Sequence, residues 1–323
     1  MKTSDRVTKL RQRFAAKEID AIFISQSENR YYLSNFDGTD GYLVITPKRA
    51  VVATDSRYTE QARQQSPDYE VFLIVGKMED WFPRLVEGMG LKRLGFESGS
   101  VTFALHQQLA KIIKDKGLAF ELVPVDGVVE PLRMVKNAQE IAFTMAAVEI
   151  SDAALEHFRL TAHAGITELE AAWEIEKHMR ESGSQALPFE VIVAAGPNSA
   201  LPHHRPSERP IKEGEPIVID IGAKVGYYAS DLTRTICIGK PDETLKKVYG
   251  IVFDAQKAAL DGIRAGMTGE QADLLARNVI QNAGYADNFG HGLGHGTGLN
   301  IHEGPRVSVR STDILEDGMI FSV

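Results

Sequence analysis

The chain has very little cysteine and no excess of positive charge. Its 323 residues include one cysteine, Cys237, so an internal disulfide is excluded, which fits a reducing cytoplasm. The formal net charge of −8 argues against nucleic acid or an anionic membrane surface as the main partner. Apolar stretches are too short to span a bilayer, and the N-terminus lacks a signal-peptide core. We therefore expect a soluble, cytoplasmic protein.

Length and hydrophobic pattern predict two domains, 1–127 and 128–323, at about 150 residues per domain. The first domain alternates helical spacing with short apolar strands, which predicts a mixed α/β fold. The second reads as two similar halves, each with two helices followed by strands. Capping boxes at Thr167 and Thr268 mark the start of the second helix in each half. Residues 125–133 are expected to form the linker between the domains.

Two aspartates flank a predicted hairpin. Asp220 follows an apolar run, Asp231 precedes another, and the turn between them is expected near Val225 and Gly226. In that register the two carboxylates are directly opposed, with Cβ atoms about 4.5–5.5 Å apart. Carboxylates that close repel each other unless a cation lies between them. The residues alone leave a second interpretation open, in which one aspartate caps a turn and the other is exposed.

Three histidines fall within twelve positions at His291, His295 and His302, interleaved with four glycines. Imidazole is a common ligand of transition metals, and the glycines would let the backbone approach a ligand closely. A solvated, glycine-rich surface loop is an alternative. A nucleotide-binding loop needs a helix after the glycines, whereas residues 298–302 are expected to form a strand, as are residues 319–323.

These motifs resemble those of the pita-bread metallopeptidases of family M24, which include prolidase, aminopeptidase P, methionine aminopeptidase and creatinase. The resemblance covers nearly the whole chain. It implies a creatinase-type α/β N-terminal domain, followed by an α+β pita-bread domain with pseudo-twofold halves. It also implies three sets of residues: the metal ligands Asp220, Asp231 and His295, the catalytic residues His203 (rather than His204) and His302, and the substrate-binding residues His291 and Phe189.

The resemblance further implies a homodimer with two divalent metal ions per subunit, manganese or cobalt, which share Asp231 and activate a water. The substrate would be a peptide with proline second, as for an Xaa-Pro dipeptidase or aminopeptidase. Alternatives are a methionine aminopeptidase-like exopeptidase and a non-catalytic binding module on the same fold. Creatinase lacks the metal-binding aspartates, so Asp220 and Asp231 count against it.

The chain departs from the family pattern at its C-terminal end. In the family, two further glutamate ligands follow in a region that begins with Glu-Pro-Gly, directly after a strand like residues 318–323. Neither glutamate is present, and the second half of the domain is shorter than the first by about one hairpin. We therefore expect the chain to be truncated, its C-terminal hairpins missing, its metal site incomplete and its peptidase activity low.

Overall fold

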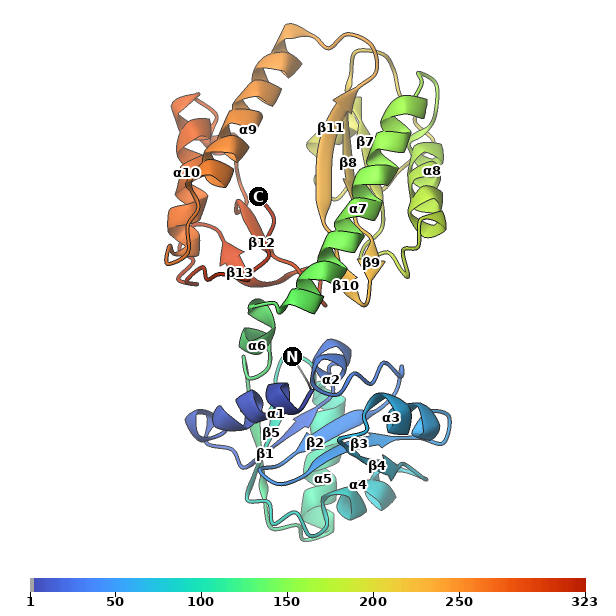
Figure 1. Cartoon of the computed structure of the whole chain (residues 1–323), viewed down its shortest axis with the longest axis vertical. Coiled ribbons are helices and arrows are strands. Elements are labelled where there is room, and N and C mark those ends of the chain that lie inside the picture. Colours follow the sequence, from blue (N-terminus) through green and yellow to red (C-terminus); the bar gives the residue numbers. More distant parts are fainter. Residues whose placement is uncertain (1–2) are drawn as a thin grey trace. The chain divides into compact units, whose positions relative to one another are not determined.

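The computed structural model describes residues 3–323, and the chain divides into two compact units, Met1–Arg133 and Met134–Val323 (Figure 1). The domain boundary after residue 127 stays a prediction. The linker expected at 125–133 overlaps the short helix α6 (Glu130–Met134). Within the described residues, no helix is both long and apolar enough to cross a bilayer.

The N-terminal unit is built on a mixed sheet with the strand order β4-β3-β2-β1-β5-β6. Strand β1 pairs antiparallel with β2 and parallel with β5. The strands are β1 (Ala21–Ile24), β2 (Tyr42–Ile45), β3 (Ala50–Thr54), β4 (Glu70–Leu73), β5 (Arg93–Glu97) and β6 (Glu121–Val125). The helices are α1 (Thr3–Gln12), η1 (Ala15–Lys17), α2 (Ser27–Ser34), α3 (Thr59–Gln65), α4 (Met78–Val86) and α5 (Phe103–Asp115).

Burial explains the central position of β1 in this sheet. All four residues of β1 are buried, as expected for an unbroken apolar run covered on both faces. Phe23 packs with Phe82 and Leu94 in the core of this unit. The mixed α/β domain expected from the sequence is thus confirmed.

The first half of the C-terminal unit contains two helices and an antiparallel sheet of order β11-β8-β7. Its elements are α7 (Ala138–Thr161), α8 (Glu168–Glu181), β7 (Ile192–Ala195), η2 (Gly196–Ala200), β8 (Pro216–Ile221), β9 (Lys224–Val225), β10 (Tyr228–Ala229) and β11 (Leu232–Cys237). The expected capping box opens α8, where Thr167 and Glu170 bond to each other's backbone N–H groups. Phe158 of α7 and Ile175 of α8 pack against Ile219 of the sheet.

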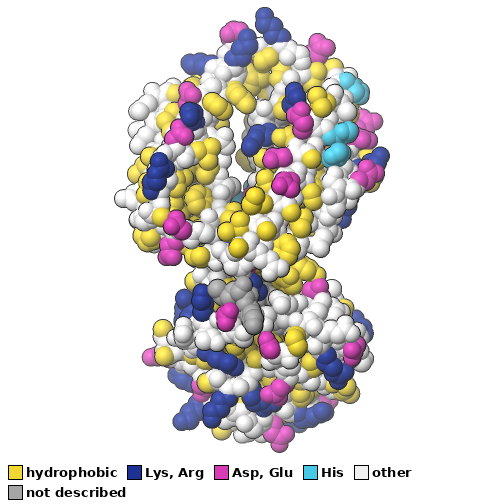
Figure 2. Space-filling model, viewed as in Figure 1, with side chains coloured by type: hydrophobic (Ala, Val, Ile, Leu, Met, Phe, Trp, Pro, Cys, Tyr) yellow, Lys and Arg dark blue, Asp and Glu magenta, His cyan; other side chains and the backbone are white. Residues whose placement is uncertain are grey.

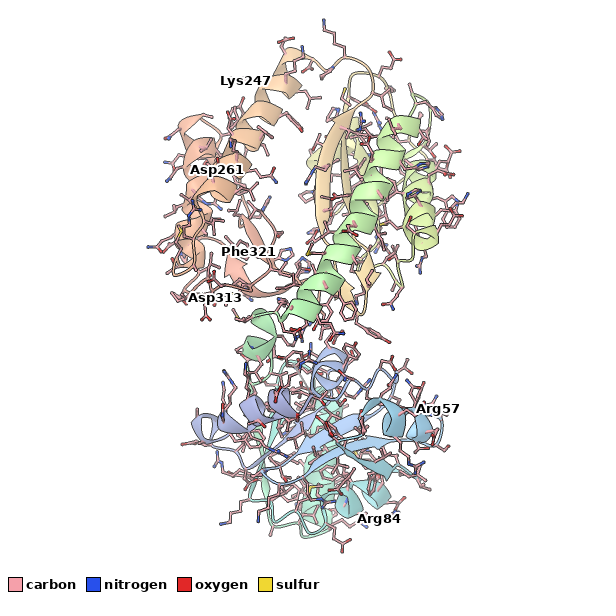
Figure 3. All side chains as sticks on the ribbon, viewed as in Figure 1. Arg57, Arg84, Lys247, Asp261, Asp313 and Phe321 are labelled. Carbon is pink, nitrogen blue, oxygen red and sulfur yellow. The ribbon has the colours of Figure 1, made fainter. Side chains whose placement is uncertain are left out.

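The second half repeats the helix pair but carries a smaller sheet. Its elements are α9 (Glu243–Gly262), α10 (Gly269–Asn282), η3 (Ala286–Asn288), β12 (Gly294–Gly296) and β13 (Glu303–Val307). The capping box predicted at Thr268 is present. Figure 3 shows Phe321 beside β12, and an isolated bridge joins it to Gly296.

Two strands expected in this half were placed wrongly. Residues 298–302 form the connection between β12 and β13, where the Asn300 N–H donates to the Glu303 carboxylate and the Gly298 N–H to the Asn300 carbonyl. These local bonds use the groups that a strand would pair with a neighbour. Residues 319–323 make isolated bridges instead of a continuous ladder.

The hairpin that carries the two aspartates is centred one residue later than expected. Its turn consists of Gly226 and Tyr227, with φ angles of 56° and 71°. A two-residue turn with positive φ at both positions matches the twist of antiparallel strands. In the resulting register, Asp220 lies opposite Thr233. The direct opposition of Asp220 and Asp231 is therefore wrong, but they remain on one face as diagonal neighbours.

Charged side chains of both signs are interspersed over the face of the molecule that Figure 2 shows. The same face exposes hydrophobic side chains over the C-terminal unit. Met145 of α7 and Phe253 of α9 are among the exposed hydrophobic residues of this unit.

Candidate active site

Asp220 and Asp231 form the acidic side of the site. Diagonal neighbours on one face of an antiparallel pair lie about 7–8 Å apart. Burial, and next the charge of Asp231, raise the pKa of Asp220 to about 6. Its Oδ1 atom is buried and has no hydrogen-bond partner among the described residues. Burial also raises the pKa of Asp231, although the histidines beside it act in the opposite direction.

Two histidines from the second half complete what we call the aspartate–histidine cluster, which consists of Asp220, Asp231, His295 and His302. His295 is on β12, and its Nε2 lies 3.3 Å from Asp231 Oδ2. Its Nδ1 lies 3.1 Å from the carbonyl of Gly296, so a proton on Nδ1 leaves Nε2 free as a ligand. The ring centroids of His295 and His302 are 4.2 Å apart. The pKa of His302 is lowered, chiefly by burial and next by His295.

The glycines around His295 have a different role from the one expected. A Cβ atom on Gly294 would lie 1.9 Å from the Ser322 carbonyl oxygen, and one on Gly296 would lie 2.0 Å from the Gly304 carbonyl oxygen. These positions therefore admit close contact between backbone segments rather than approach of a ligand. The Ser322 N–H also donates to the His295 carbonyl at 2.9 Å, which fixes the strand that carries the histidine.

His203 and His204 are adjacent but differ in surroundings. His204 Nε2 lies 2.8 Å from the buried carboxylate of Glu168. His203 is exposed, yet its charge affects the pKa values of both Asp220 and His302. The structure thus leaves the His203 ring near the cluster and engages the His204 ring elsewhere.

The two expected substrate-binding residues lie in different parts of the unit. His291 is exposed in the loop before β12, with its ring 5.0 Å from that of Phe289. Phe189 is half-buried, and its Cε1 would lie 2.9 Å from a Cβ atom on Gly222, two residues beyond Asp220. A substrate role for either residue stays a prediction.

The chemistry of the cluster fits a divalent cation. Within residues 3–323, no group of three or more His, Cys, Asp or Glu side chains is placed so that it could hold a metal ion. The cluster nevertheless brings together a buried carboxylate oxygen without a partner among the described residues, two carboxyl groups with raised pKa values, and His295 Nε2, which lies beside Asp231. A cation bound between them would satisfy the orphaned oxygen and remove the repulsion.

A recess elsewhere in this unit is separate from the cluster. It has a volume of about 640 Å³ and is lined by residues 213–216 and 240–243. Pro216 is the first residue of β8, so the recess lies at the opposite end of the hairpin from the aspartates. It contains no histidine, and we do not associate it with the chemistry of the site.

Three residues near the site were missed by the sequence interpretation. Thr233 lies opposite Asp220, and its hydrogen bond partly offsets the rise in the pKa of that carboxyl. Its position two residues after Asp231 puts it on the same face, so the period of a strand could have identified it. Glu168 and Asp273 are buried carboxylates, whose contacts no sequence pattern revealed.

Comparisons with known proteins agree over nearly the whole chain. Residues 143–323 match the model of metallopeptidase family M24, and residues 6–135 match that of the Creatinase/Prolidase N-terminal domain. An Xaa-Pro dipeptidase of Pyrococcus horikoshii is 35% identical over 322 residues, which cover 99% of this chain and 89% of that protein.

Solved structures are similar to the same extent. The Xaa-Pro dipeptidase from Bacillus anthracis has a TM-score of 0.95 and 39% identity, covering 99% of this chain and 89% of that one. An X-Pro aminopeptidase from Thermotoga maritima has a TM-score of 0.86 and 36% identity, covering 96% and 88%. These similarities confirm the expected creatinase-type and pita-bread domains. The chain spans 89% of the two dipeptidases and 88% of the aminopeptidase, and the truncation expected from the sequence stays a prediction.

Proposed function

This chain belongs to metallopeptidase family M24, and we propose that it is an exopeptidase that hydrolyses the peptide bond before a proline. Proteins named Xaa-Pro dipeptidase and X-Pro aminopeptidase, similar along nearly all of the chain, support this substrate class. The observation that carries the proposal is the Asp220 carboxyl, which is desolvated, faces a second carboxyl and has one oxygen without a partner.

Membership of the family implies divalent metal ions. We propose that Asp220, Asp231 and His295 hold two of them, with Asp231 shared. Carboxylates with a single imidazole suit manganese or cobalt. Bound there, the ions supply an activated water and polarise the scissile carbonyl.

His203 and His302 are proposed to contact the peptide. Burial and His295 lower the pKa of His302, which favours the neutral ring, and a neutral imidazole can donate one hydrogen bond to a developing oxyanion. His203, on an exposed loop, can reach a substrate without disturbing the protein core. His291 and Phe189 are proposed to line the substrate's path.

A matched pair of dipeptides tests the substrate class. The manganese-loaded protein should hydrolyse Ala-Pro far faster than Ala-Ala, and comparison of Ala-Pro with Ala-Pro-Ala separates a dipeptidase from an aminopeptidase. Equal rates on Ala-Pro and Ala-Ala, or a preference for an N-terminal methionine, would refute the proline specificity. The choice of metal, the homodimer and the cytoplasmic location remain proposals based on the sequence.

A further inference from the structure

Two carboxylates outside the aspartate–histidine cluster are fully buried in the C-terminal unit. Glu168 is the first residue of α8, and Asp273 is on α10, so each belongs to the second helix of its half. Both side chains have 0% exposure. A buried carboxylate is unfavourable unless donors surround it, so the identity of the donors indicates the role.

Glu168 accepts hydrogen bonds from one segment of the chain, residues 195–207. Its Oε1 accepts from the Ala195 N–H at 2.8 Å and from Asn198 Nδ2 at 2.9 Å. Its Oε2 accepts from the Ser207 N–H at 3.1 Å and the Ser207 hydroxyl at 2.6 Å, and lies 2.8 Å from His204 Nε2. These donors enclose residues 198–207 on both sides, and His203 lies between them.

Asp273 has the corresponding contacts in the second half. Its Oδ1 accepts from the Leu293 N–H at 2.9 Å, and both of its oxygens bind the guanidinium of Arg277. Arg277 in turn donates to the carbonyls of Phe289 at 2.9 Å and His291 at 2.7 Å. The pair therefore holds the segment that leads into β12 and His295.

We propose that Glu168 and Asp273 are positioning residues, each of which holds the loop that delivers histidines to the site. Glu168 sets the place of His203, and Asp273, through Arg277, sets the places of His291 and His295. This inference rests on the proposed function for its catalytic consequence, but the anchoring itself can be measured without any activity.

The charge of Glu168 suits this role. Burial opposes its ionisation, yet the hydrogen bonds from Ser207, Ala195 and Asn198 outweigh burial and lower its pKa to about 2. The carboxylate is therefore ionised at any neutral pH. In Glu168→Gln, one acceptor oxygen becomes an NH₂ group. That group is a donor and would face the hydrogen-bond donors of the loop, so the bonds to this position would be lost.

Hydrogen exchange of the manganese-loaded protein tests the anchoring. Backbone amides of residues 196–207 should exchange at least tenfold faster in Glu168→Gln, and those of 286–296 in Asp273→Asn, while each variant leaves the other loop unchanged. Glu170→Gln, the same substitution in the capping box of α8, is the matched control and should change neither loop. Unchanged exchange in the targeted loop, or faster exchange throughout the unit, overturns the proposal.

Kinetics with Ala-Pro test the consequence. Glu168→Gln should lower kcat/KM by roughly tenfold to a hundredfold, because small misplacements of catalytic groups have effects of that size. The loss should equal that of His203→Ala, and the double variant should lose no more than either single variant. Additive losses would overturn the positioning role. If His203→Ala retains full activity, the proposed role of His203 fails, while the exchange measurement still decides the anchoring.

A second, milder variant tests the proposal if Glu168→Gln does not fold. Asn198→Ala removes a donor from the loop and leaves the buried carboxylate with its other partners. It should speed exchange in residues 196–207 and lower kcat/KM in the same direction as Glu168→Gln, by a smaller factor. If Glu168→Gln does not fold and Asn198→Ala leaves the loop unchanged, the proposal is wrong.

Discussion

Replacing Asp220 with asparagine should stabilise the metal-free protein. The rise in the pKa of Asp220 from its ordinary value of 3.8 to about 6 corresponds to about 3 kcal/mol of unfavourable free energy when the group is ionised. Asp220 is only half-buried, so screening by solvent reduces the expected gain to about 1–3 kcal/mol. For a unit of this size, each 1 kcal/mol raises the Tm by about 2–4 °C.

The pH dependence of this gain has a definite sign. The pKa of Asp220 is higher in the folded state than in the unfolded chain, so the folded parent is stabilised by a proton below about pH 4. That stabilisation is lost as the pH rises through about 6. The asparagine side chain of the variant cannot ionise, so the advantage of Asp220→Asn should be absent at pH 4 and constant above about pH 6.5.

Calorimetry of the metal-free parent and variant at pH 4 and 7.5 measures this difference. Asp261→Asn is the control, because Asp261 is exposed on α9 (Figure 3), pairs with the exposed Lys257, and its replacement should change stability little. Added Mn²⁺ should raise the Tm of the parent but not that of Asp220→Asn. A variant that melts at or below the parent at pH 7.5, or gains equally at pH 4, would refute the reasoning.

Two further outcomes are expected. Asp231→Asn should reduce the bound metal from two ions to one or none per chain by elemental analysis, because this carboxylate is proposed to be shared, and two ions retained would exclude that role. Gly226→Ala should destabilise the protein by about 1–3 kcal/mol in urea unfolding, because φ is 56° and the new Cβ would lie 2.7 Å from the ring of Phe143. Gly250→Ala, on α9 with open space around it, is the control and should stabilise by about 0.5–1 kcal/mol.

Elements set by local rules could be predicted from the sequence. The apolar run of β1, the capping boxes at Thr167 and Thr268 and the helix pairs of both halves lie where the pattern places them. In these elements, periodicity and capping are properties of neighbouring residues. The convergence of Asp231 with His295 was implied by the resemblance, and the structure brings the two side chains together.

The errors arose where distant segments decide the structure. The turn lies one residue later than the sequence suggested, at Gly226, which packs against Phe143 of α7. The residue opposite Asp220 is therefore Thr233 instead of Asp231. The glycines near His295 were misinterpreted because their close neighbours come from other segments. Ser322, near the C-terminal end, contacts Gly294, and Gly304 of β13 contacts Gly296. Glu168 could not be recognised, since its donors are 27 to 39 residues away.

Because the turn at Gly226 and Tyr227 has only two residues, the number of residues between it and each aspartate decides whether the two carboxylates share a face. Successive side chains of a strand point to opposite faces, so one residue inserted between the turn and Asp231 would move its carboxylate away from Asp220. One residue added to each strand would lengthen the hairpin and leave the two carboxylates on the same face. Changes in the length of this hairpin are therefore compatible with the site only in steps of two.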